Sequence, residues 1–106
     1  HNMKKIIIVT GGNRGLGKSL IDVFLKFNDT IIISVSRSVH ESHLNLTKSK
    51  FHFLKTDLSQ PFYYDSVDLI IKQTNKVSCI YYFNNASVIL PINSVSSSLS
   101  GSYTIL

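Results

Sequence analysis

The chain has 106 residues, of which 43% are hydrophobic and 16% are charged, so we expect one modest globular domain and exclude a disordered chain. Eleven Lys and Arg residues outnumber six Asp and Glu residues, but they are too scattered to predict a nucleic-acid surface. The sequence holds no apolar run near the ~18 residues of a membrane span. With one cysteine and no visible signal peptide, we expect a cytoplasmic protein with neither a nucleic-acid nor a membrane partner.

The first part of the sequence predicts a strand, a turn and a helix. We interpret residues 1–2, ahead of Met3, as left by a cloning vector. Residues 5–10 read KIIIVT, a β-branched run typical of a strand buried on both faces, and a glycine-rich turn follows. A stripe of large apolar residues then recurs at helical spacing: Leu16, Leu20, Phe24 and Phe27. We expect this stripe to be the buried face of an amphipathic helix that ends near Asn28.

The rest of the sequence alternates predicted strands with predicted helices or long connections. The expected elements are a strand over 30–36, a polar loop over 37–49 with room for one short helical turn, a strand over 51–55, a turn over 57–61, a helix over 63–75 and a strand over 77–83. This alternation predicts an α/β fold with a parallel sheet, the mononucleotide-binding half of a doubly wound, Rossmann-like fold. We assign residues 3–92 to it, and the serine-rich residues 93–106 to an irregular tail.

The glycine-rich turn between the first strand and the first helix fits two kinds of phosphate site. Gly11, Gly15 and Gly17 would let the backbone approach a diphosphate at the helix N-terminus. Alternatively, residues 12–19 read GNRGLGKS, which matches the phosphate loop of NTPases, with Lys18 on the phosphates and Ser19 on magnesium. That alternative lacks an Asp at the end of the strand over 77–83, where Asn84 and Asn85 stand instead.

Two motifs resemble the short-chain dehydrogenase/reductase family. Residues 10–17, TGGNRGLG, resemble its TGxxxGxG fingerprint, and residues 84–87, NNAS, resemble its NNAG motif with serine in place of glycine. The resemblance implies a sheet of about four strands in the order 3-2-1-4 and a nicotinamide cofactor. The residues that it places at the cofactor are Gly11, Asn13, Arg14, Gly15, Leu16, Gly17, Asn84, Asn85, Ala86 and Ser87.

The end of the second predicted strand favours NADP(H) over NAD. An acidic residue there would hold the ribose hydroxyls of NAD, but residues 34–38 read SVSRS and contain no carboxylate. Arg37 can fork onto a 2′-phosphate, the hydroxyls of Ser36 and Ser38 can add hydrogen bonds, and Arg14 is positioned to join them. The resemblance also assigns Asp57, followed by Leu58, to the adenine; the competing interpretation is a plain turn or helix-capping aspartate.

The resemblance implies an oxidoreductase that reduces a small-molecule carbonyl compound by hydride transfer. The family's Ser, Tyr and Lys lie beyond the NNAG motif, and this chain ends at Leu106, so we carry over no catalytic residue and expect no turnover from the truncated chain. Tyr103 follows the Asn-Asn pair too closely to be the catalytic tyrosine. A non-catalytic dinucleotide-binding module is the remaining alternative.

Two further expectations concern a metal and association. His40 and His43 stand three residues apart, but no third ligand is evident, so we expect no metal site. In the family's strand order the fourth strand is interior. Without a neighbour, the strand over 77–83 would expose an apolar edge, and we therefore expect a homo-oligomer.

Overall fold

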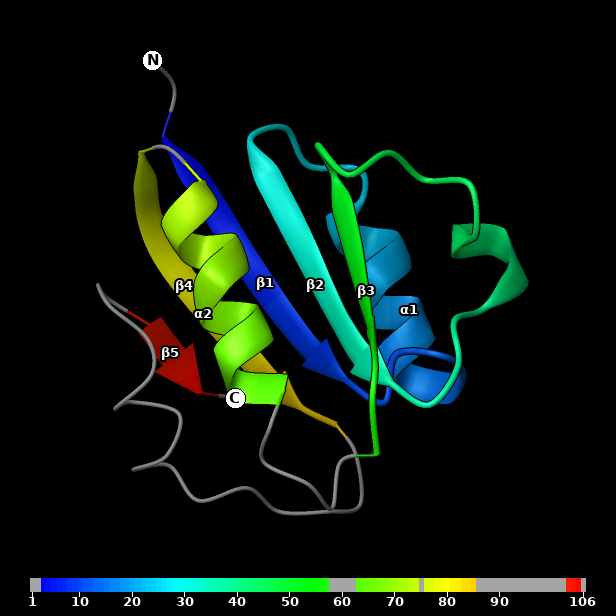
Figure 1. Ribbon diagram of the computed structural model, residues 1–106. Coiled ribbons are helices and arrows are strands. Elements are labelled where there is room, and N and C mark those ends of the chain that lie inside the picture. The colour runs from blue at the N-terminus through cyan, green and yellow to red at the C-terminus, as the bar shows by residue number, and fades with distance from the viewer. Residues whose placement is uncertain (1–2, 58–62, 75, 86–102, 106) are drawn as a thin grey trace.

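The computed structural model describes residues 3–57, 63–74, 76–85 and 103–105. Its elements in chain order are β1 (Lys4–Thr10), α1 (Gly15–Phe24), β2 (Thr30–Ser36), the short 3₁₀ helix η1 (Glu41–His43), β3 (Phe51–Lys55), α2 (Tyr63–Gln73), β4 (Val77–Asn84) and β5 (Tyr103–Ile105). The strands form one parallel sheet in the order β3-β2-β1-β4-β5 (Figure 1). The predicted order of the first four strands is confirmed.

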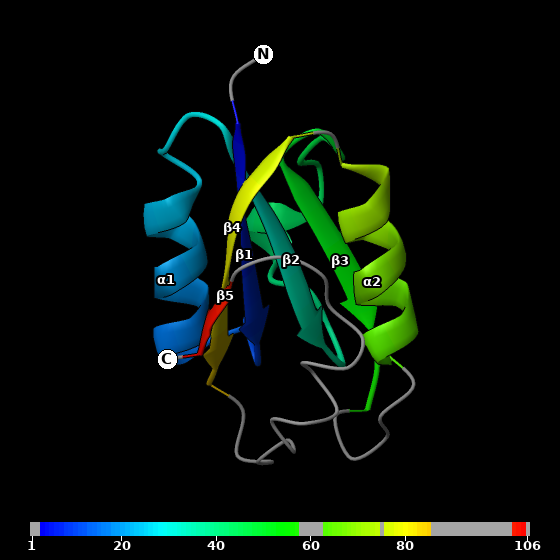
Figure 2. The ribbon, with the colours of Figure 1, turned by 90° about the vertical axis from the view of Figure 1, so that its left-hand side faces the viewer.

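The sheet has a hydrophobic layer on each face because β1 and β2 are buried on both sides. Ile6 and Ile8 of β1 belong to the layer under α2, whereas Ile7 and Val9 belong to the layer under α1. The two helices accordingly lie on opposite faces of the sheet (Figure 2). This alternation explains why the β-branched runs predict the strands so closely: such residues suit a pleated surface that is covered from both sides.

The end of α1 differs from the prediction. The helix ends at Phe24 rather than near Asn28, because the chain tightens there into bonds that span three residues: the Lys26 amide donates to the Val23 carbonyl at 3.2 Å, and the Phe27 amide to the Phe24 carbonyl at 3.1 Å. Asp29, with a φ of 57°, then turns the chain into β2. In α2 the predicted end at residue 75 is replaced by an end at Gln73.

The predicted buried face of α1 is confirmed only in part: Phe24 packs against the hydrophobic layer on that side of the sheet, but two of the four predicted residues are exposed. Leu16 is 67% exposed and Phe27 is 50% exposed, whereas Gly17 and Ile21 are buried against the sheet. The reason is geometric: the first turn of α1 approaches the backbone at the end of β1 so closely that only a glycine fits there. Ile21, one turn later, then enters the core beside Ile7 and Val9.

The tail differs from its prediction as well. Residues 103–105, which we expected to be irregular, form β5 and pair in parallel with β4, with Ile80 opposite Tyr103 and Tyr82 opposite Ile105. The far edge of β4 is therefore partnered along its middle. This pairing covers part of the edge from which we expected self-association, and the expected homo-oligomer stays a prediction.

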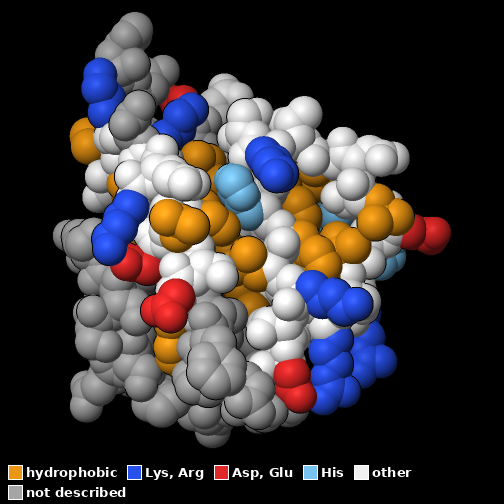
Figure 3. Space-filling view, viewed as in Figure 1, with side chains coloured by type: hydrophobic (Ala, Val, Ile, Leu, Met, Phe, Trp, Pro, Cys, Tyr) orange, Lys and Arg blue, Asp and Glu red, His pale blue; other side chains and the backbone are white. Residues whose placement is uncertain are grey.

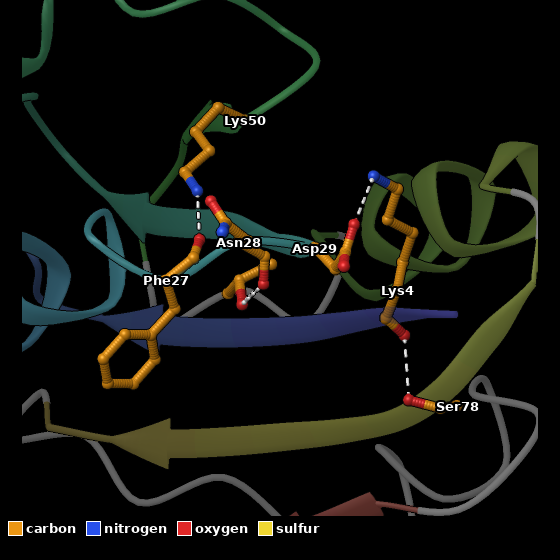
Figure 4. Close-up of polar contacts among 7 residues, drawn as sticks. Lys4, Phe27, Asn28, Asp29, Lys50 and Ser78 are labelled. Atoms are coloured by element: carbon orange, nitrogen blue, oxygen red, sulfur yellow. Dashed lines mark hydrogen bonds and ion pairs between the residues drawn. The ribbon is translucent and has the colours of Figure 1, made fainter. Parts of the chain in front are cut away.

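The amino-terminal edge of the sheet is held by polar contacts far from the glycine-rich turn (Figure 4). The Lys4 ammonium lies 3.5 Å from an Asp29 carboxylate oxygen, and the Ser78 hydroxyl donates to the Lys4 carbonyl at 3.2 Å. Lys50 donates to the Phe27 carbonyl and so ties the start of β3 to the chain after α1. These lysines serve the fold at the edge opposite the candidate site.

Candidate functional site

The candidate site lies at the carboxyl edge of the sheet, where the chain connections diverge. From β1 the chain passes to β2 on one side, whereas β4, on the other side of β1, is reached only after β3 and α2 (Figure 1). In open parallel sheets ligands bind outside the carboxyl ends of the strands at such a switch point. The loop after β1 and the pair Asn84–Asn85 after β4 both lie there.

The loop over 11–15 has a backbone that suits glycine at its two ends. Gly11 and Gly15 have φ values of 68° and 58°, in the left-handed region that side chains disfavour. Gly17 is required for a different reason. A Cβ at that position would overlap the Gly11 carbonyl oxygen and would lie 2.6 Å from the Asn85 amide nitrogen. The helix can therefore begin against the bare backbone of the loop only with glycine at 17.

The N-terminus of α1 is left available to an anion. Arg14 occupies the N-cap position in an extended conformation, and its side chain makes no capping hydrogen bond in the described part of the chain. The first turn contains no acidic residue. The amide groups of this turn and the positive end of the helix dipole favour a phosphate group there.

Amide side chains connect the ends of β1 and β4. Asn85 donates its side-chain amide to the Gly11 carbonyl at 3.2 Å, and the Thr10 hydroxyl donates to the Asn84 side-chain oxygen at 3.0 Å. Thr10 is fully buried, so its hydroxyl makes this hydrogen bond in the interior, at the carboxyl ends of β1 and β4. The two bonds fix the glycine-rich loop relative to β4.

A second group of polar residues lies at the ends of β2 and β3. The Asn13 amide donates to the Ser38 hydroxyl at 3.2 Å and links the glycine-rich loop to the chain after β2. Ser36 is buried and donates its hydroxyl to the Ser38 carbonyl at 2.6 Å, so this hydroxyl shapes the turn. The Arg37 guanidinium, whose side chain is 82% exposed, lies 3.8 Å from an Asp57 carboxylate oxygen.

Sequence reasoning missed a contact that joins α1 to η1. The His43 imidazole is buried and lies 2.8 Å from one Asp22 oxygen, while the Lys18 ammonium lies 2.6 Å from the other. Hydrogen bonds from Lys18 and then from His43 hold the pKa of Asp22 below its ordinary value. Lys18 and Asp22 stand at helical spacing, which was a visible signal, but nothing in the sequence placed His43 beside them.

The same contact bears on the NTPase interpretation. Lys18 lies inside α1 and pairs with a carboxylate one turn further from the helix N-terminus, so its ammonium is directed away from the place a phosphate would occupy. Within the described ranges, no group of three or more His, Cys, Asp or Glu side chains is placed to hold a metal ion. None of the helices in the described part of the chain is long and apolar enough to cross a membrane.

Three of the predicted site residues lie outside the described residues: Leu58, Ala86 and Ser87. The others fall into two groups along the carboxyl edge. One group surrounds the glycine-rich loop: Gly11, Asn13, Arg14, Gly15, Leu16, Gly17, Asn84 and Asn85. The second group, Ser36, Arg37 and Asp57, is connected to the first through Ser38.

No protein-family model matches the chain. Its sequence is 32% identical, over 99 residues, to an uncharacterized oxidoreductase of Saccharomyces cerevisiae; the match covers 88% of this chain and 37% of that protein. The chain thus spans little more than a third of the length of the curated relative that it matches.

Solved structures share the fold. A short-chain dehydrogenase/reductase from Burkholderia vietnamiensis superposes with a TM-score of 0.70 at 22% identity, over 96% of this chain and 62% of that one. The yeast short-chain dehydrogenase/reductase gives a TM-score of 0.61 at 29% identity, over 83% and 36% of the two chains. A Leptospira borgpetersenii short-chain dehydrogenase, crystallised with bound NAD⁺, gives 0.57 at 17% identity, over 86% and 35%.

Proposed function

The chain has the fold and the sequence motifs of the N-terminal part of a short-chain dehydrogenase/reductase, and from this premise we propose that it binds NADP(H) as the cofactor-binding part of a carbonyl-reducing oxidoreductase. The observation that carries the proposal is the close approach of Gly17 to Gly11 and Asn85, which brings the start of α1 against the bare backbone of the glycine-rich loop, where its amides could hold a diphosphate. A side chain at position 17 would fill the space that this contact needs.

Each part of the cofactor has residues suited to it. The amides at the start of α1 would hold the diphosphate, since the N-cap side chain makes no hydrogen bond with them. Arg37 and Arg14 would favour the 2′-phosphate of NADP(H), because no carboxylate ends β2. Asn84 and Asn85 would keep the nicotinamide end beside β4. When bound, the nicotinamide supplies or accepts a hydride.

The preference for NADP(H) depends on how firmly Asp57 holds Arg37. The pair is 3.8 Å apart and both side chains are more than half exposed. Ion pairs of this kind contribute about 0–1 kcal/mol, less than a charged hydrogen bond to a phosphate. Arg37 can therefore exchange the carboxylate for a 2′-phosphate at little cost. The carboxylate of Asp57 would remain beside the adenine.

Calorimetric titration with NADPH, NADH and Mg-ATP tests the proposal. We expect tighter binding of NADPH than of NADH, and no magnesium-dependent binding of ATP, because Lys18 is paired with Asp22. Binding of Mg-ATP alone would favour an NTPase, and failure to bind any dinucleotide would refute the proposal. In a parallel assay with a dicarbonyl and NADPH we expect no turnover. Steady oxidation of NADPH there would show that this chain itself carries catalytic residues.

A further inference from the structure

A lysine that the sequence motifs do not single out lies beside the proposed 2′-phosphate site. Lys55 is the last residue of β3, and the strand register places it opposite Ser36, the last residue of β2. Adjacent strands are about 4.8 Å apart, so the backbone of Lys55 lies one strand spacing from the residue that precedes Arg37. The Thr56 amide donates to the Ser36 carbonyl at 2.9 Å and keeps the two strand ends together.

The register also determines the face of the sheet on which Lys55 stands. Phe51, four residues earlier in β3, packs with Ile21 of α1 in the layer on that side. Alternate residues of a strand share a face, so Phe51, Phe53 and Lys55 all point toward the side of α1. The glycine-rich loop lies on the same side of the sheet. Ser34, two residues before Ser36 in β2, faces Gly12 of this loop, and the Asn13 amide donates to the Ser38 hydroxyl just beyond β2.

The charges at this place favour an anion. Lys55 is exposed, and within the described residues no ion pair involves it. Among the described residues, the ion pair that Arg37 makes is the long, exposed one with Asp57. Lys and Arg side chains gather near the carboxyl ends of β2 and β3, at the lower right of Figure 3, with acidic colour beside them. Two cations from neighbouring strand ends thus face one carboxylate.

We propose that Lys55 is a specificity-determining residue that binds the 2′-phosphate of the cofactor together with Arg37. The inference rests on the proposed function, since it needs an adenosine 2′-phosphate at the end of β2. A phosphate bound by Arg37 beside Ser36 would lie within reach of the long Lys55 side chain, which extends from the neighbouring strand. The diphosphate of such a cofactor would lie at the start of α1, next to β1, and would be held by other groups.

The test compares adenosine 2′,5′-bisphosphate with adenosine 5′-monophosphate, two probes that differ only in the 2′-phosphate. Lys55→Gln should weaken binding of the bisphosphate by about threefold to tenfold, as loss of an exposed charge contact to a phosphate predicts. It should leave binding of the monophosphate unchanged. Lys55→Arg should retain the preference. Lys26→Gln is the matched control, because Lys26 is an exposed lysine beyond the far end of α1 and its loss changes the net charge equally.

The outcomes separate the two proposals. If the unmodified chain prefers the bisphosphate but Lys55→Gln keeps that preference, the role of Lys55 is refuted and the proposed function stands. Equal weakening of both probes would also refute it, since that indicates a structural effect. If the unmodified chain does not distinguish the probes, the proposed preference for NADP(H) fails, and the role of Lys55 fails with it. Thermal unfolding of each variant confirms that it is folded.

Discussion

The Asn85 side-chain amide donates to the Gly11 carbonyl at 3.2 Å, and this bond joins the end of β4 to the first residue of the glycine-rich loop. Gly17 of α1 lies against the same bond: a Cβ at this position would overlap the Gly11 carbonyl oxygen and would crowd the Asn85 amide nitrogen. The glycine-rich loop and the first turn of α1 thus meet the end of β4, which is distant from both in sequence. The start of α1 is positioned by this contact rather than by a capping side chain.

Gly17→Ala should therefore destabilise the folded chain. Its Cβ would overlap a backbone oxygen that cannot move without breaking the bond from Asn85, so we expect the free energy of unfolding to fall by about 2–3 kcal/mol, as in overpacked cores. Gly15→Ala is the matched control: nothing lies within 4 Å of its added Cβ, and only the positive φ opposes it, at about 1 kcal/mol. Urea unfolding measures both. Equal losses for the two variants would contradict the close-contact explanation.

Arg37→Ala should weaken NADPH binding by about 1–3 kcal/mol and leave NADH binding unchanged, because the lost charged hydrogen bond is made only to the 2′-phosphate. Stability should hardly change, since the pair with Asp57 is exposed and long. Titration of the variant with each dinucleotide, beside a thermal unfolding curve, checks both expectations. Equal weakening of NADPH and NADH would show that Arg37 does not read the phosphate.

The strands could be predicted from sequence because local patterns determine them. The β-branched run over 30–36 and the run over 51–55 with its two phenylalanines give β2 and β3 at their observed bounds, and the fold follows from their alternation with helices. The face of α1 could be predicted only in part: Phe24 packs on the core as expected, but the large side chains of Leu16 and Phe27 mark a helix without saying which side approaches β1. A glycine decides that, through a contact with the loop.

The candidate site likewise contains residues that the sequence could locate and residues that it could not. The glycine-rich loop and the Asn-Asn pair are contiguous motifs, so spacing alone located them. Lys55 and His43 could not be found, because each acquires its neighbours through strand register or through packing of a loop on α1. The strand β5 was missed for a related reason. It has only three residues, too few for a legible sequence pattern, and its pairing with β4 identifies it as a strand.

His52 should make the protein less stable in mild acid. Burial, and then the charge of Lys48, hold the pKa of His52 below its ordinary value of 6.5. The unfolded chain therefore binds a proton more readily than the folded chain in the window just below pH 6.5. The contribution to stability is complete above that pH and is lost as the pH falls toward the folded-state pKa.

Comparison of His52→Gln with the unmodified chain isolates this effect. Between pH 7 and pH 5 the free energy of unfolding should fall less in the variant, because glutamine does not titrate. Urea unfolding at several pH values gives the difference, and an NMR titration of the His52 ring gives the folded-state pKa directly. A ring pKa at or above the ordinary value, or identical pH profiles for the two chains, would show that the burial of His52 has no such effect.

Removal of β5 should make the chain self-associate. Residues 103–105 pair with Ile80, Tyr81 and Tyr82 in the middle of β4, so a chain that ends at residue 102 would leave backbone groups and an apolar edge of β4 exposed. We expect its sedimentation coefficient to rise with concentration, whereas the full chain should change little. Thr104→Ala is the matched control, because it keeps the backbone that forms the ladder. If the shortened chain sediments as a monomer at every concentration, then β5 is not what protects β4 from association.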